Sequence, residues 1–297
     1  MTEAKIPDLV TVISDGMFYR CESLTNITIP DGVTKIGTRA FQFCTALTDI
    51  VVPESIIEID ARGFSDCTSL QSVAIPGALS MGESVFFRCE SLTNVVLAEN
   101  LASIPDRTFE YCRSLKTISI PEGVEKIGDG AFSDCINLKK VSIPDGVLAI
   151  GDEAFMNAEG LIDINIPDSV VQIGECSFSF CYGLTEIRIP GSIKEIPSEA
   201  FRGCNNLDNL VLDEGVEIIG RAAFDDCTSL TTIMVPASVK SILYYAFSDY
   251  TKTLKSVYFA GSAPDIGGLV FSNAILYHKP DAEGWTNPWN GYTTETY

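Results

Sequence analysis

The sequence predicts an α/β solenoid that is mostly β-structure, in which coils of 23 residues stack on one another. Three observations support this fold class: a phenylalanine recurs every 23 residues, except for intervals of 22 before Phe86 and 24 before Phe271; four other apolar columns keep the same register; and turn residues recur at one place in each unit. A unit of this length buries its apolar side only against neighbouring units, so the units are expected to share one core. The recurring residues are Phe18, Phe41, Phe64, Phe86, Phe109, Phe132, Phe155, Phe178, Phe201, Phe224, Phe247 and Phe271.

The unit that starts at Leu115 shows the expected strand most clearly. Its first segment reads Leu-x-x-Ile-x-Ile-Pro, with β-branched residues, alternation at its end, and a proline whose missing N–H ends a hydrogen-bonded ladder. Leu115, Ile118 and Ile120 are expected to point inward. Because identical columns stack like on like, these strands are expected to form one long parallel sheet, with about 4.8 Å between coils.

A corner and two shorter sides complete each unit. Residues 121–123 read Pro-Glu-Gly, where proline fixes φ and glycine accepts the positive φ of a tight corner. Val124 and Ile127 are expected to bury a second side with a short strand. Residues 131–132 mark a third side, whose spacing predicts a turn of 3₁₀- or α-helix. The alternative fold is a parallel β-helix, with comparable strands on all three sides.

The cysteines form a column of their own, three residues after the phenylalanine. The same column contains Ala158 and Tyr250, and a position that accepts Cys, Ala or Tyr is a packing position. We therefore expect a ladder of buried free thiols, although occasional disulfides between coils are geometrically possible. A metal needs converging ligands, which a straight column does not supply. The column contains Cys21, Cys44, Cys67, Cys89, Cys112, Cys135, Cys181, Cys204 and Cys227.

The repeat pattern ends after Phe259, which divides the chain into two parts. Residues 1–260 are expected to form a repeat array of about 11 coils, the first of them partial. Residues 261–297 contain both tryptophans, and large aromatic side chains cover an open solenoid end well. We expect this segment to form a last irregular coil and an aromatic C-terminal cap. The alternative is an aromatic platform that binds carbohydrate.

The 23-residue unit resembles the leucine-rich repeat of the BspA-like group, which includes a Treponema pallidum surface protein. The resemblance covers about residues 5–260 and rests on the strand pattern and on the Ala-Phe-x-x-Cys element seen at 131–135. It implies a leucine-rich-repeat solenoid and a non-enzymatic surface or secreted protein that adheres to host matrix proteins, epithelium or other bacteria. The family has no fixed binding motif, so the resemblance assigns no binding residue.

The composition and the sequence motifs argue against binding to nucleic acid, insertion into a membrane and catalysis. A formal charge of −20 disfavours binding to nucleic acid and to anionic membranes. No apolar run approaches the roughly 20 residues of a membrane span, and the first ten residues lack the features of a signal peptide. His278 is the only histidine, so no Ser-His-Asp or Cys-His pair can form within the repeats. We expect no enzyme, no cofactor and no metal site.

One outward-facing strand column changes character along the chain. The residues in the first half of the column have small, uncharged side chains, whereas the last four residues have larger and more varied ones. Arg, Met and Tyr are enriched at the cores of protein interfaces, so these four are the predicted ligand-binding residues, against the alternative of an ordinary sheet surface. They are Arg188, Val211, Met234 and Tyr258.

Two further surface features are weaker candidates. An acidic corner column is either a solvated edge or a weak site for divalent cations between coils: Asp31, Glu54, Glu99, Glu122, Asp145, Asp168 and Glu214. A set of aromatic residues is either scattered exposed side chains or a second contact surface: Phe43, Phe87, Tyr111 and Phe180, with Tyr19 and Tyr182 nearby.

Two functions remain open at this stage. The first is a cell-surface or secreted adhesion module that recognises a protein or glycan, such as a host matrix or epithelial component, through its extended repeat surface. Such a module is expected to be monomeric and not inserted into the membrane in this segment. The alternative is a cytoplasmic scaffold for protein–protein interactions, which the reduced-looking cysteine ladder and the absence of a signal peptide from this segment favour.

Overall fold

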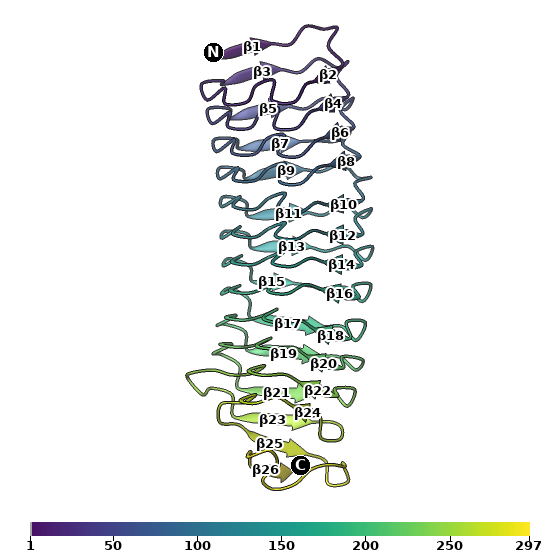
Figure 1. Cartoon of the computed structure of the whole chain (residues 1–297), viewed down its shortest axis with the longest axis vertical. Helices are drawn as coiled ribbons and strands as arrows, with labels where there is room; N and C mark the ends of the chain where they lie inside the picture. The colour runs from purple at the N-terminus through teal and green to yellow at the C-terminus, as the bar shows by residue number, and fades with distance from the viewer. Residues whose placement is uncertain (1) are drawn as a thin grey trace.

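The computed structural model describes residues 2–297 as a parallel β-solenoid of about 12 turns (Figure 1). The coils follow one another in sequence order from one end of the stack to the other, and the two termini lie at opposite ends. None of the residues 2–297 is helical. The expected fold class, a mostly β solenoid of 23-residue coils, is confirmed.

The first side of the coils, which we call the strand face, carries the longer strands. Consecutive strands pair in parallel, and residues that stand opposite one another are usually 23 apart, as with Thr117 and Lys140. The strands run along the whole solenoid, but their hydrogen bonds divide them into five shorter sheets rather than one. Each strand has only two to four residues, so a small shift of one coil interrupts the ladder. They are β1 (Glu3–Lys5), β3 (Asn26–Thr28), β5 (Asp49–Val51), β7 (Ser72–Ala74), β9 (Asn94–Val96), β11 (Thr117–Ser119), β13 (Lys140–Ser142), β15 (Asp163–Ile164), β17 (Glu186–Ile189), β19 (Asn209–Leu212), β21 (Thr232–Val235), β23 (Ser256–Phe259), β25 (Ile275–His278) and β26 (Thr294–Thr296).

The second side carries strands of two residues each, in three sheets of four strands. All strand-face strands except β15 have three or four residues, and the third side has no strand ladder within residues 2–297. The three sides therefore do not carry the comparable strands that the alternative β-helix requires. The second-side strands are β2 (Val12–Ile13), β4 (Lys35–Ile36), β6 (Glu58–Ile59), β8 (Ser80–Met81), β10 (Ser103–Ile104), β12 (Lys126–Ile127), β14 (Ala149–Ile150), β16 (Gln172–Ile173), β18 (Glu195–Ile196), β20 (Ile218–Ile219), β22 (Ser241–Ile242) and β24 (Asp265–Ile266).

The third side, which we call the turn side, shows that the expected helical turn is wrong. The N–H of Ala131 donates to the carbonyl of Gly128 within its own coil (3.3 Å), but the N–H of Phe132 donates to Ala154 of the next coil (2.7 Å). Every second N–H group therefore donates its hydrogen bond to the next coil. The continuous hydrogen bonds within one coil that a helical turn needs cannot form. The chain turns through residues in the left-handed region, such as Asp134 with φ of 57°.

The core consists of the predicted columns. From Phe18 to Phe271 the phenylalanine rings are buried and stack in sequence, with neighbouring centroids 5.1–5.8 Å apart and ring planes within 12° of parallel. Offset stacking of this kind adds to the free energy gained by burial. The phenylalanine ladder thus runs through the whole array.

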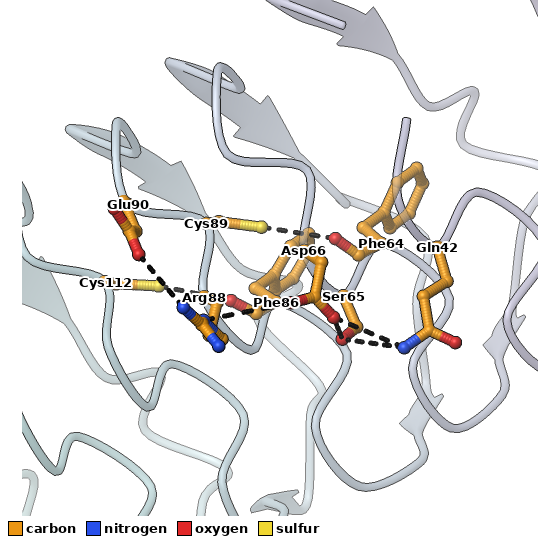
Figure 2. A network of polar contacts seen from close by, with 9 residues as sticks. All are labelled: Gln42, Phe64, Ser65, Asp66, Phe86, Arg88, Cys89, Glu90 and Cys112. Atoms are coloured by element: carbon orange, nitrogen blue, oxygen red, sulfur yellow. Dashed lines mark hydrogen bonds and ion pairs between the residues drawn. The ribbon is translucent and has the colours of Figure 1, made fainter. Parts of the chain in front are cut away.

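The cysteine ladder lies beside the phenylalanine ladder, and all of its thiols are buried except that of Cys21, which is half-buried. Each buried thiol donates a hydrogen bond to a backbone carbonyl of an adjacent coil. Figure 2 shows two such bonds, from Cys89 to Phe64 (3.2 Å) and from Cys112 to Phe86 (3.3 Å). Burial raises the pKa of the eight buried ladder thiols, that of Cys204 to about 12.

Thiol labelling is expected to separate the eight buried ladder cysteines from the two half-buried ones, Cys21 of the ladder and Cys176 outside it. Cys21 and Cys176 are half-buried, so iodoacetamide at mildly alkaline pH should modify these two in the folded chain and all ten cysteines after unfolding in urea. Mass spectrometry counts the modified thiols. The matched control is the Cys21→Ser, Cys176→Ser variant, which should stay unmodified while folded. Rapid modification of any of the eight buried ladder thiols, or a disulfide-linked peptide pair, would contradict the burial of the ladder.

Polar side chains on the turn side link successive coils. Figure 2 shows the amide of Gln42 donating to the carboxylate of Asp66 (3.3 Å), which in turn lies 3.9 Å from the guanidinium of Arg88. The same guanidinium lies 3.8 Å from Glu90. Because Arg88 is about half exposed and both N–O distances are close to 4 Å, these ion pairs are expected to contribute little to stability, so the apolar columns remain its main source.

The C-terminal residues continue the stack with a different register. β25 pairs with β23, Ser256 lying opposite Ile275, and β26 pairs with β25. Trp289 is buried, and Tyr292 packs against the core with its ring 5.5 Å from Phe271. On these contacts we propose that residues 261–297 cap the array.

The aromatic contacts of Trp285 bear on the carbohydrate alternative. The indole ring stacks in parallel on His278, at 4.9 Å between centroids, and lies 4.7 Å from the ring of Phe259 and 4.6 Å from that of Trp289. A sugar platform needs a free aromatic face. Trp285 packs within its own chain but is only half-buried, and with His278 it lines a hollow of about 600 Å³, so the carbohydrate alternative stays a hypothesis.

Candidate functional site

The four predicted ligand-binding residues lie in one column on the C-terminal half of the strand face, and we call them the strand-face patch: Arg188, Val211, Met234 and Tyr258. In register, Arg188 of β17 stands opposite Val211 of β19, and Met234 of β21 opposite Tyr258 of β23. Their neighbours along each strand are buried, so these side chains point outward. Val211 is 43% and Met234 49% exposed, which leaves two apolar side chains in contact with solvent.

Arg188 is an electrostatically compensated residue. Its Nη1 atom lies 2.8 Å from Oδ1 of Asp168, and its Nη2 atom contacts Asp213 on the following coil. These hydrogen bonds, that to Asp168 above all, raise the pKa of Arg188. Asp213 stands where most coils have the strand-ending proline. Because two carboxylates already hold the guanidinium, it is not a free receptor for an anionic ligand.

The patch ends in a group of three tyrosines, two of which the sequence interpretation missed. The ring of Tyr258 stacks on that of Tyr277 at 4.7 Å and meets that of Tyr297 edge-on at 5.2 Å. The hydroxyl of Tyr297 donates to the carbonyl of Phe259 (3.3 Å). The repeat period could not place Tyr277, because β25 follows β23 after 19 residues and not 23. The alternating segment Ile-Leu-Tyr-His at 275–278 is the signal that could have found it.

Two hollows lie along the patch, and together we call them the strand-face groove. The larger, of about 400 Å³, lies beside Met234, Tyr258 and Tyr297. The smaller, of about 230 Å³, lies beside Arg188 and shares Asn209 with the larger. The larger hollow is big enough to receive a bulky side chain of a partner. The remaining lining residues are Asp163, Ile164, Asn165, Glu186, Ile187, Asp208, Leu210, Val211, Thr232 and Ile233.

A cavity of about 530 Å³ on the turn side is a second concave feature. Glu199 at its wall binds Arg202 (2.9 Å) and Arg221 (3.0 Å). Burial raises the pKa of Asp225 to about 6; repulsion from Asp226 adds to this, and Arg202 opposes it. Charges of both signs line the cavity and largely compensate one another. Its chemistry therefore indicates no particular class of ligand.

The two weaker candidate surfaces do not gather into sites. All seven residues of the acidic corner column are exposed, and residues 2–297 contain no group of three or more His, Cys, Asp or Glu that could hold a metal ion. The aromatic set forms three separate pairs along the turn side: Tyr19 with Phe43, Phe87 with Tyr111, and Phe180 with Tyr182. Neither feature offers the continuous surface that the strand face has. A second contact surface on the turn side stays a hypothesis.

The described residues contain no helix that could span a membrane. The family model for the BspA type leucine-rich repeat region matches residues 1–115, 79–170 and 148–277. No curated protein matches this chain.

Solved structures of bacterial repeat proteins are similar to this chain. A leucine-rich repeat protein from Bacteroides ovatus is 26% identical, with a TM-score of 0.76, over 100% of this chain and 84% of the other. A leucine-rich cell surface protein from Faecalibacterium prausnitzii is 33% identical, with a TM-score of 0.55, over 88% of this chain and 80% of the other. A leucine-rich repeat protein from Eubacterium ventriosum is 20% identical, with a TM-score of 0.54 and coverage of 92% and 88%, and shares the fold.

Proposed function

This chain belongs to the BspA-type leucine-rich repeat family, and from that premise we propose that it is a non-enzymatic bacterial surface module that binds a protein through its strand-face patch. Repeat solenoids characteristically use an extended face for binding. The module acts as a monomer and adheres to a host or bacterial surface component. Its acidic charge, −20 in total, disfavours nucleic acid as the partner.

The observation that carries the proposal is the apolar end of the patch beside an open hollow. Met234 is 49% exposed next to the tyrosine group and the hollow of about 400 Å³. An exposed apolar patch with a polar rim is typical of a protein-binding site, and tyrosine and a flexible methionine are suited to its centre. Val51, at the other end of the same column, is also exposed, but it stands alone between Thr28 and Ala74.

The surface location has its own support. The 33% identical protein from Faecalibacterium prausnitzii is described as a cell surface protein. The cytoplasmic scaffold remains the second candidate, but the cysteine ladder no longer favours it. Because eight of the nine ladder thiols are buried and hydrogen-bonded to carbonyls, these eight are protected from oxidation in either compartment. A glycan is the alternative ligand, and the tyrosine group is the feature that would contact it.

Substitution within the patch is expected to weaken binding strongly. The Met234→Ser, Tyr258→Ser variant removes two central contact groups, and hot-spot residues of this kind contribute about 2 kcal/mol, or about 30-fold in affinity. Surface plasmon resonance against a panel of purified host matrix proteins and mucin glycans measures the change for each ligand that binds.

The matched control changes the same column in the N-terminal half. Val51 is 82% and Val96 49% exposed, so the Val51→Ser, Val96→Ser variant alters as much exposed apolar surface on the same face. Its affinity should stay within about twofold of the wild type. Equal losses in both variants, or an unchanged affinity in the patch variant, would remove the patch from the proposal.

A further inference from the structure

The strand-face groove carries negative charge along one wall. Asp163, Glu186 and Asp208 are exposed on three successive coils, and none of them forms an ion pair with any residue that the structure describes. The one guanidinium of the groove, on Arg188, is held by Asp168 and is thus compensated. Among the residues that the structure describes, the groove therefore has unpaired carboxylates and no unpaired cation.

Lysines mark the two ends of this acidic wall. Lys140 stands opposite Asp163 in the ladder between β13 and β15. At the other end, the ammonium group of Lys255 donates to the carbonyl of Lys252 in its own loop. The carboxylates of Glu186 and Asp208 lie between these ends. Since no cation of the described residues forms an ion pair with either carboxylate, a basic ligand can supply one.

The length of the groove fits a short extended peptide. Three coil steps separate the coil of Met234 from the coil that carries Asp163 and Asn165, which is about 14 Å at roughly 4.8 Å per step. An extended chain covers this length with about five residues, at roughly 3.3 Å per residue. Alternate side chains of an extended peptide face the same side, about 6.6 Å apart. One apolar side chain and two following cations can thus meet the hollow and the acidic wall together.

We propose that the groove binds an extended, basic segment of a partner protein, with an apolar residue in the hollow at Met234 and Tyr258 and with Lys or Arg at the next two alternate positions. This inference rests on the proposed function and gives its partner a chemistry. The cations face the carboxylates of Glu186 and Asp163, with Asp208 at the mouth of the hollow. A second copy of this chain, which also carries a charge of −20, and anionic polymers are repelled by the same wall.

Fluorescence anisotropy with synthetic peptides tests the proposal on the whole chain. The probes are fluorescein-labelled Leu-Ser-Lys-Ser-Lys and its reversed sequence, because the groove does not fix the chain direction. Matched peptides replace both lysines by glutamine or by glutamate. At least one lysine peptide should bind at millimolar concentration or below, at least tenfold more tightly than its glutamine form, and the glutamate forms should not bind. Equal binding of the glutamine forms, or no binding of either lysine peptide, would overturn the inference.

Charge-neutral variants locate the binding. The Asp163→Asn, Glu186→Gln, Asp208→Asn variant keeps the shape of the groove wall and should weaken binding of the lysine peptide about tenfold. Raising the salt concentration from about 50 to about 300 mM should weaken wild-type binding more than that of the variant.

A control with the same change in net charge separates local from general electrostatics. The Asp31→Asn, Glu54→Gln, Glu99→Gln variant removes three exposed carboxylates from the corner column, and its affinity should change less than twofold. An equal loss in this control overturns the inference. If only the Met234→Ser, Tyr258→Ser variant loses the peptide, the patch keeps its proposed function and the preference for cations is wrong. If the peptide binds and that variant binds it unchanged, the proposed function itself fails.

Discussion

Replacing Phe132 by alanine is expected to lower the free energy of unfolding by about 4 kcal/mol. The ring is fully buried and stacks on two others, 5.4 Å from Phe109 and 5.2 Å from Phe155. Its removal forfeits the burial of the ring and both stacking contacts, and leaves a cavity that the hydrogen-bonded coils close only in part. Because each coil contacts only its neighbours, the effect should concentrate in three coils. Urea denaturation gives the total, and hydrogen exchange gives its distribution.

A graded control is available at the other end of the same ladder. Phe18 is 8% exposed and stacks on one ring only, that of Phe41 at 5.2 Å. Phe18→Ala should therefore cost about half as much as Phe132→Ala, because burial is less complete and one stacking contact is lost in place of two. A similar loss at both positions, or a loss below about 1 kcal/mol at Phe132, would mean that the ladder does not carry the stability of the array.

The repeat period predicts those features that depend on position within the coil. A constant interval of 23 residues places Phe132 above Phe109 and Cys112 above Cys89, and both columns are buried in the structure. The same reasoning places Met234 and Tyr258 on one outward column, since side chains alternate along a strand. Stacking of like on like needs no knowledge of the loops, and for that reason the core was predictable.

The turn side was not predictable from spacing alone. Ala131 and Phe132 have the spacing of a helical turn, but their N–H groups alternate between the same coil and the next one. The competing acceptors are carbonyls 22 residues further along the chain, such as that of Ala154 for Phe132. A local pattern does not contain this competition. Even residues with side chains accept left-handed φ there, such as Phe43 at 63°, because the stack holds them in place.

The candidate site was predictable as a column and not as a chemical environment. The compensation of Arg188 by Asp168 and Asp213 depends on how the corners of three coils meet, which the period leaves open. The tyrosine group depends on the changed register of β25, which brings Tyr277 onto Tyr258. Both effects arise where the chain departs from its own repeat.

Near the C-terminus, the chain begins to depart from its 23-residue repeat at Asp249. This residue lies in the one coil that is 24 residues long, between Phe247 and Phe271. Tyr250 takes the place of the ladder cysteine and is 90% exposed, so the chain leaves the core here. The carboxylate of Asp249 is buried, and its two oxygens accept bonds from the backbone N–H of Thr253 (3.1 Å each) and from that of Leu254 (3.4 Å). The hydroxyls of Thr251 and Thr253 donate to it as well. One side chain thus organises the loop that leads into β23 and the tyrosine group.

Asp249→Ala is therefore expected to lower the free energy of unfolding by about 3 kcal/mol, because it leaves the backbone N–H groups of Thr253 and Leu254 without their acceptor in a partly buried loop. Asp249→Asn keeps one acceptor oxygen and should cost about 1 kcal/mol. The exposed Asp281, changed to alanine, serves as the control for the loss of a C-terminal carboxylate and should have no measurable effect. Urea denaturation followed by tryptophan fluorescence reports on this end of the array, where Trp285 lies 4.7 Å from Phe259. A cost at Asp249 no larger than that at Asp281 would show that the loop keeps its shape without the carboxylate, and that the stacking of β25 on β23 alone positions the tyrosine group.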